Sequence, residues 1–255
     1  MPKLKIAISI DRELLRQADA HVDGSVIRSR SQAIELFLEK GLSLKRIDTA
    51  VIFLKGDHQE LALENVGGRS LILRQLEFFG RHGIKQAFIV TQYSRNINRL
   101  LTEVSKSDLN VRIVEKQAKG NADALLAVEP KLPDSFVAIS GDTYNDFNLS
   151  DMIQKHIQTG KLVTLGLMSA GEPSKYGIAV LDGDLIVDFE EKPKVARSNV
   201  VNAGIYVFSR EALALLDRQT VSLEKDLFPK LARIRQLLGY FTHGEYRHLG
   251  ASCQP

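Results

Sequence analysis

Residues 136–142, with the sequence FVAISGD, constrain the fold more than any other stretch of this chain. A short apolar run that ends at Gly141 and Asp142 predicts a buried parallel strand with a carboxylate at its C-terminal end. Ligands of open α/β sheets collect outside the carboxyl ends of the strands, so we expect Asp142 at a site. A carboxylate there suits Mg²⁺ held together with substrate phosphates. The alternative is a turn residue ahead of the helix that begins near Ser150.

Strands and helices alternate on both sides of this strand. Strands are predicted at 49–54, 86–91, 111–114, 137–140 and 161–168, helices at 70–82 and from about Ser150, and a hairpin around Asp182 and Gly183. This order predicts an α/β domain over residues 47–255, with a mixed sheet and helices on both faces.

The composition is that of an ordinary globular protein. Of 255 residues, 44% are hydrophobic and 25% charged, and Cys253 is the single cysteine. No apolar run reaches the roughly 18 residues of a membrane span, and the N-terminus lacks the apolar region of a signal peptide. No internal disulfide can form, and no Cys/His cluster has the spacing of a zinc site. We therefore expect no membrane association and a cytoplasmic location.

Residues 1–46 carry the whole positive excess of the chain and form the first predicted domain. They hold nine Lys and Arg against six Asp and Glu, whereas the remainder holds 25 of each. Residues 3–10 alternate in polarity and predict a strand, and helices are predicted after Asp11 and from Ser29, where Gln32 completes a capping box. One strand and two helices cannot bury their own apolar faces, which predicts pairing with a second copy.

This segment resembles the ribbon-helix-helix family of DNA-binding domains in its alternating basic strand and in the openings of both helices. The resemblance implies a homodimer, or a dimer of dimers, on double-stranded DNA with a pseudo-palindromic operator. Strand residues would contact bases, and the start of the second helix would contact phosphates. The implied DNA-binding residues are Lys3, Lys5, Ala7, Ser9, Ser29, Arg30 and Ser31. The alternative is an oligomerisation ribbon that binds no DNA.

Residues 47–255 resemble the sugar-phosphate nucleotidyltransferases, whose fold is a Rossmann-like, GT-A-like mixed sheet. Motifs in the family order lie at 66–69, 120–126, 140–142, 175–177, 190–193, 201–206 and 224–229. The family joins a sugar 1-phosphate to a nucleoside triphosphate and releases pyrophosphate. The resemblance implies a site for a sugar nucleotide or sugar phosphate, with Gly177, Glu191, Lys192 and Asn202 on the sugar-phosphate side, Gly120 and Asp123 on the base side, and Gly56 and Asp142 beside the phosphates.

Two positions depart from the family pattern. The loop at 54–61 keeps Gly56 alone of its glycines and has Glu60 where the family has an Arg. An Arg on a triphosphate makes charge-assisted hydrogen bonds worth roughly 1.5–3 kcal/mol each, and a Glu there would repel the phosphates instead. His248 stands where a second metal-binding Asp is expected, and imidazole is a poor ligand for Mg²⁺.

These departures favour a DNA-binding transcriptional regulator. Its nucleotidyltransferase-like domain would be catalytically inactive, would require no cofactor, and would sense a sugar nucleotide or a related metabolite. The alternative is an active sugar-1-phosphate nucleotidyltransferase that oligomerises or autoregulates through its ribbon. In that case Asp142 would hold Mg²⁺, Lys192 would bind the sugar phosphate, and Lys55 would replace the missing Arg.

Overall fold

A computed structural model describes residues 7–24, 27–42, 47–217, 219–241 and 244–249 of the chain. The chain divides into two compact units, Met1–Arg46 and Ile47–Pro255. Among the described residues, no helix is both long enough and apolar enough to cross a membrane.

The first unit contains the two predicted helices, α1 (Arg12–Ala20) and α2 (Arg30–Leu42). Asp11 caps α1, because its Oδ1 accepts hydrogen bonds from the backbone N–H groups of Glu13 and Leu14. At the start of α2, the Ser29 hydroxyl accepts from the backbone N–H of Gln32 at 3.3 Å. The short polar side chains therefore begin both helices where the sequence predicts.

The predicted ribbon is not shown. Ala7 and Ser9 lie in a segment without regular structure, and Lys3 and Lys5 lie outside the described residues. Arg30, assigned above to DNA phosphate, instead donates to both carboxylate oxygens of Asp19, at 2.6 and 2.7 Å. The described part of this unit is thus a pair of short helices joined by local hydrogen bonds. The predicted dimer stays a prediction.

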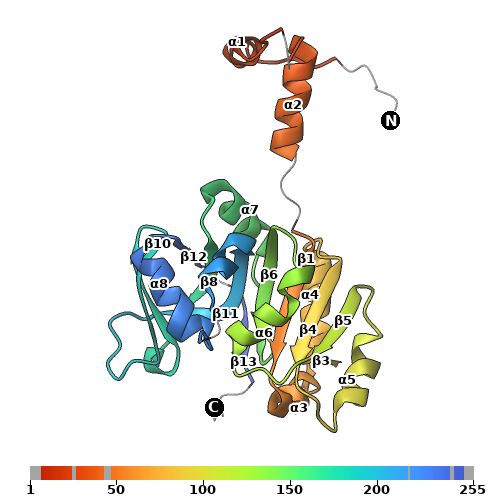
Figure 1. Ribbon diagram of the computed structural model, residues 1–255, viewed down its shortest axis with the longest axis vertical. Coiled ribbons are helices and arrows are strands. Elements are labelled where there is room, and N and C mark those ends of the chain that lie inside the picture. Colours follow the sequence, from red (N-terminus) through yellow and green to blue (C-terminus); the bar gives the residue numbers. More distant parts are fainter. Residues whose placement is uncertain (1–6, 25–26, 43–46, 218, 242–243, 250–255) are drawn as a thin grey trace. The chain divides into compact units, whose positions relative to one another are not determined.

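A nine-stranded mixed sheet is the core of the second unit, in the order β5-β4-β1-β6-β11-β8-β12-β10-β9 (Figure 1). The first four strands are parallel, and β11 runs antiparallel to both of its long neighbours, β6 and β8. Their bounds are β5 (Asn110–Glu115), β4 (Gln86–Thr91), β1 (Thr49–Leu54), β6 (Ser135–Ser140), β11 (Val200–Ser209), β8 (Val163–Ser169), β12 (Leu237–Phe241), β10 (Leu185–Glu191) and β9 (Gly177–Asp182). The sheet confirms the α/β prediction.

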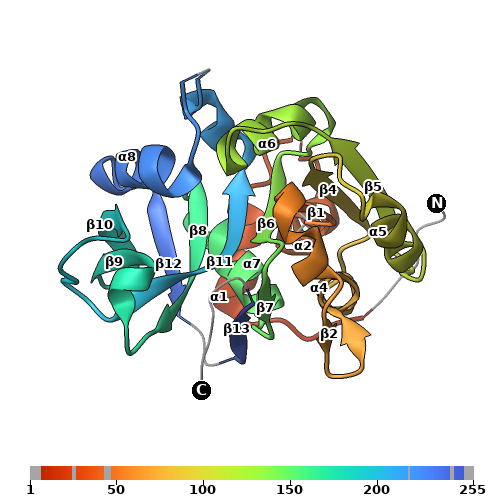
Figure 2. The same cartoon turned by 90° about the horizontal axis from the view of Figure 1, so that it is seen from below.

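Helices cover both faces of this sheet (Figure 2). One apolar cluster buries residues of α6 (Asn121–Val128) and α8 (Phe228–Arg233), and a second buries residues of α4 (Leu71–Arg81), α5 (Ile97–Val104) and α7 (Leu149–Thr159). Shorter elements are α3 (Gln59–Ala62), the hairpin of β2 (Asn65–Val66) and β3 (Arg69–Ser70), and the antiparallel pair of β7 (Thr143–Asn145) and β13 (Tyr246–His248).

Asp142 follows the C-terminal end of β6, as predicted. The turn is fixed from outside, because the Gln75 amide donates to the carbonyl oxygens of Ser140 at 2.9 Å and Thr143 at 2.6 Å. Asn148, and not Asp142, caps the next helix by accepting from the N–H of Asp151 at 3.3 Å. The carboxylate of Asp142 is therefore not used as a helix cap and can contact other groups at this edge of the sheet.

The strand that leads to Asp142 depends on a stacked aromatic pair. Phe136 of β6 and Phe208 of β11 are fully buried, and their ring centroids are 5.3 Å apart at 5°. Phe136→Ala would leave a cavity between the strands, so we expect the free energy of unfolding to fall by about 3–5 kcal/mol in urea denaturation. Tyr93→Ala, at a side chain that is 77% exposed, is the control and should change it by less than about 0.5 kcal/mol.

Candidate active site

A pocket of about 910 Å³ opens at the carboxyl ends of the parallel strands. The segments that follow β1, β4, β5 and β6 form one wall, and residues 219–226 with the end of β10 form the other. The volume is that of a site for a small organic ligand, at the edge of the sheet where α/β proteins bind theirs.

Five lysines line this pocket, together with the acidic residues Asp142, Glu191, Glu224 and Asp226. The lysines come from separate segments: Lys55 follows β1, Lys116 and Lys119 follow β5, Lys192 follows β10, and Lys225 belongs to the single π-helical turn Leu223–Leu227. Lys116 lies 3.7 Å from Asp123, and the other four are in no ion pair among the described residues. Unpaired ammonium groups around one cavity favour a ligand with several negative charges.

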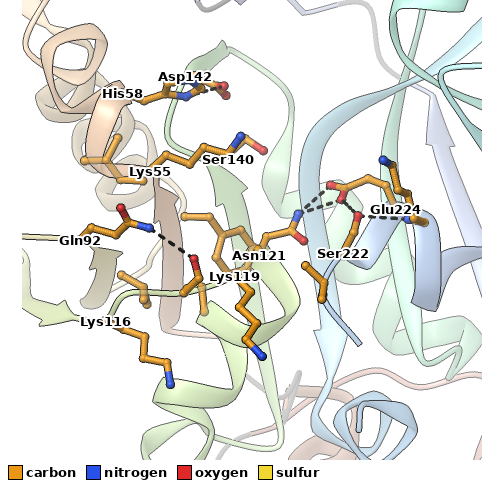
Figure 3. A pocket seen from close by; sticks show the side chains of 18 of the residues that line it. Lys55, His58, Gln92, Lys116, Lys119, Asn121, Ser140, Asp142, Ser222 and Glu224 are labelled. Atoms are coloured by element: carbon orange, nitrogen blue, oxygen red, sulfur yellow. Dashed lines mark hydrogen bonds and ion pairs between the residues drawn. The ribbon is translucent and has the colours of Figure 1, made fainter. Parts of the chain in front are cut away.

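The two walls are joined through the side chain of Asn121, the first residue of α6. Its Nδ2 donates to both carboxylate oxygens of Glu224 at 2.9 Å, and its Oδ1 accepts from the backbone N–H of Leu223 at 2.8 Å (Figure 3). A Cβ on the preceding Gly120 would lie 2.2 Å from the carbonyl oxygen of Val221. Glycine is thus required where the two backbones approach.

Glu224 also fixes the environment of Glu191. Its carboxylate accepts further hydrogen bonds from the hydroxyl groups of Ser222 at 2.9 Å and of the fully buried Tyr206 at 3.1 Å. Burial first, and then the negative charge of Glu224, raise the pKa of Glu191 to about 7. The pocket therefore contains a carboxyl group that is part protonated near neutral pH and can donate a hydrogen bond.

Lys192 has an unusual backbone. Its φ of 49° is in the left-handed region that side chains rarely adopt, and its N–H donates to the carbonyl oxygen of Tyr176 at 3.0 Å. A non-glycine residue in this region costs about 1–3 kcal/mol, and such strain is concentrated at functional sites.

At the far end of the pocket, Asp142 is paired with two imidazoles. Its Oδ2 lies 3.2 Å from Nδ1 of His58, the last residue of the short 3₁₀ turn Gly56–His58, and 3.4 Å from Nε2 of His248 in β13. Burial alone would raise the pKa of Asp142, but the hydrogen bond from His248 and the nearby His58 lower it below its usual value. Asp142 is therefore ionised at neutral pH.

These residues do not fit Mg²⁺. The ion prefers six oxygen ligands in an octahedron, whereas one carboxylate and two imidazoles meet here. Within the described ranges, no three His, Cys, Asp or Glu side chains are grouped so that they could hold a metal.

The structure brings half of the predicted ligand residues to the pocket: Gly120, Asp142, Glu191 and Lys192. The other four predicted residues do not line the pocket but contact residues in or next to its walls. Asp123 accepts from the N–H of Lys119 at 3.0 Å, Asn202 donates to the Tyr206 hydroxyl at 2.9 Å, Gly177 packs against Phe189 and Glu191, and Gly56 packs against Gln92. Their roles toward a ligand stay predictions.

Among the pocket residues that the sequence prediction missed are Gln92, Lys116 and Lys119. Gln92 directly follows β4, Lys116 directly follows β5 and Lys119 comes three residues later, so a position just beyond a strand end was the available signal. Glu60 lies outside the pocket, exposed, and accepts from the Asn96 amide at 3.3 Å. The prediction of an inactive site placed Glu60 against the phosphates, whereas the structure places it against Asn96 and not among the residues that line the pocket.

The fold and this pocket agree with the family to which the sequence is similar. Residues 59–246 match the family model described as nucleotidyl transferase. The chain therefore belongs to the nucleotidyl transferase family.

Two relatives from animals are similar to most of the chain. It is 30% identical over 190 residues to the mannose-1-phosphate guanylyltransferase catalytic subunit beta of Danio rerio, covering 71% of this chain. It is 28% identical over 195 residues to the protein of the same name in Drosophila melanogaster, covering 74%. In both cases the match covers 53% of the relative, so the chain spans about half the length of the curated relatives it matches.

Solved structures show the same fold. A UDP-glucose pyrophosphorylase in complex with UDP-glucose aligns with a TM-score of 0.65 at 18% identity, covering 80% of this chain and 94% of that one. HddC from Yersinia pseudotuberculosis aligns with a TM-score of 0.69 at 16% identity, covering 81% and 95%.

The prediction of a DNA-binding transcriptional regulator is wrong. The two animal relatives are named as mannose-1-phosphate guanylyltransferases, which supports the alternative, an active nucleotidyltransferase. The DNA contacts assigned above to strand residues 3–9 and to Ser29, Arg30 and Ser31 depended on that interpretation and are withdrawn with it.

Glu191→Gln tests the unusual carboxyl group. The folded-state pKa of about 7 exceeds the unfolded value of about 4.3, so the native state binds more protons between these pH values, and the contribution of Glu191 to stability falls as the pH rises through them. We expect the variant to melt higher than the wild type at pH 8, with a smaller difference at pH 5. An equal difference at both pH values, as for the exposed Glu190→Gln control, would contradict this assignment.

Proposed function

We propose that this chain is a sugar-1-phosphate nucleotidyltransferase. An oxygen of the sugar phosphate attacks the α-phosphorus of a nucleoside triphosphate, the bond to the β-phosphate breaks, and pyrophosphate leaves. The observation that carries the proposal is the set of five lysines in one pocket at the carboxyl ends of the parallel strands. Such a pocket suits two reactants that both carry phosphate, because ammonium groups offset the repulsion between the reacting anions.

Mannose 1-phosphate and GTP are the first pair to test, because the relatives are named for this reaction. In our proposal Lys192 binds the phosphate of the sugar phosphate, and Glu191 and Asn202 bind its sugar. The loop with Gly120 and Asp123 binds the base of the nucleotide. Lys55 takes the charge-neutralising role of the missing Arg. Mg²⁺, which the resemblance implies, would accompany the nucleotide.

Pyrophosphate release from GTP and a panel of sugar 1-phosphates tests the proposal. We expect release with mannose 1-phosphate, and Lys192→Ala should lower kcat/KM for the sugar phosphate roughly 10- to 100-fold, the loss of one charge-assisted hydrogen bond. Lys194→Ala removes an exposed lysine outside the pocket and is the matched control. No release with any pair of nucleotide and sugar phosphate would refute the proposal.

A further inference from the structure

The pairing of Asp142 with two histidines is built by three separate parts of the chain. Asp142 follows β6, His58 lies in the turn after β1, and His248 belongs to β13. Antiparallel pairing places His248 opposite Thr143, and the N–H of Leu249 donates to the Asp142 carbonyl oxygen at 2.9 Å. Backbone hydrogen bonds therefore hold the imidazole against the carboxylate.

The buried Nδ1 of His248 indicates which ring nitrogen faces Asp142 as a donor. Its Nδ1 is buried and has no hydrogen-bond partner in the part of the chain described. A proton there would be a buried donor without an acceptor, which is costly. A proton on Nε2 avoids this cost, because that nitrogen faces the Asp142 oxygen 3.4 Å away.

A nitrogen that donates its N–H to Asp142 has no lone pair for a metal. His58 Nδ1 approaches the same Oδ2 at 3.2 Å, so one carboxylate oxygen faces two imidazole nitrogens. A cation at this place would have to displace both imidazoles from that oxygen and would gain a single carboxylate. Two of the pocket lysines, Lys116 and Lys119, lie at the end away from Asp142 (Figure 3).

We propose that Asp142 in this chain is the shared partner of His58 and His248 and is not a ligand for a divalent cation. The carboxylate positions His58, which lines the pocket. This inference deepens the proposed function and rests on it for one statement: a cation needed for transfer is carried by the phosphates of the nucleotide.

Binding of Mn²⁺ to the ligand-free full-length chain, followed by electron paramagnetic resonance of the free ion, tests the proposal. Mn²⁺ is a stringent probe, because it accepts both oxygen and nitrogen ligands. We expect wild type and Asp142→Asn to bind Mn²⁺ equally and weakly. A wild-type site of one ion per chain that Asp142→Asn abolishes would overturn the proposal.

A gain of binding is the second expectation. His248→Asp removes one imidazole and places a second carboxylate beside Asp142, so this variant should bind one Mn²⁺ at least tenfold more tightly than the wild type, and adding Asp142→Asn should cancel the gain. Arg247→Asp, an exposed position in the same strand, is the control and should gain nothing. A folded His248→Asp without the gain would overturn the role of His248; if circular dichroism shows it unfolded, the comparison of wild type with Asp142→Asn decides.

The proposed function and this inference fail in different experiments. The Mn²⁺ measurement uses no nucleotide or sugar, so an absence of pyrophosphate release leaves its result unchanged. Conversely, a wild-type site that requires Asp142 would overturn the inference while the transfer reaction still holds.

Discussion

The parallel pairing of β5, β4, β1 and β6 is the constraint on which the site depends. Parallel strands all end at the same edge of the sheet, so the segments that follow them must meet there. β4, β1 and β6 are almost entirely buried, whereas β5 lies at the edge of the sheet and is half-buried to exposed. The residues just beyond these strands, among them Lys55, Gln92, Lys116 and Asp142, line the pocket. The polar and charged side chains that can bind a ligand thus lie just beyond the ends of the strands.

Two local arrangements determine which side chains meet at this edge of the sheet. Asn121 bonds to Glu224 and Leu223 and so joins the two walls of the pocket, which lets ammonium groups from both walls face one cavity. At the other end, β13 places His248 against Asp142. The family reaction needs positive charge around phosphate, and in this chain the pocket lysines are the side chains that can provide it.

Much of the second unit could be predicted, because strands such as 49–54 and 86–91 are apolar runs of the right length between turn signals. The error was to assume that a residue at the position of the family Arg also directs its side chain at the phosphates. Glu60 stands at that position, but it belongs to the short helix α3 and its side chain contacts Asn96. The pairing of Asp142 with both His58 and His248 could not be predicted, since it joins residues that are distant in the sequence. In the first unit, alternation over residues 3–10 indicated a strand, but the described residues 7–10 form none.

The central claim is that one pocket holds a nucleotide and a sugar phosphate in position to react, and the reverse reaction tests it most directly. Phosphorus NMR would follow the full-length chain with GDP-mannose and pyrophosphate. The account predicts that the signals of GTP and mannose 1-phosphate rise in equal amounts. An unchanged spectrum, or hydrolysis to GMP without formation of a triphosphate, would contradict it.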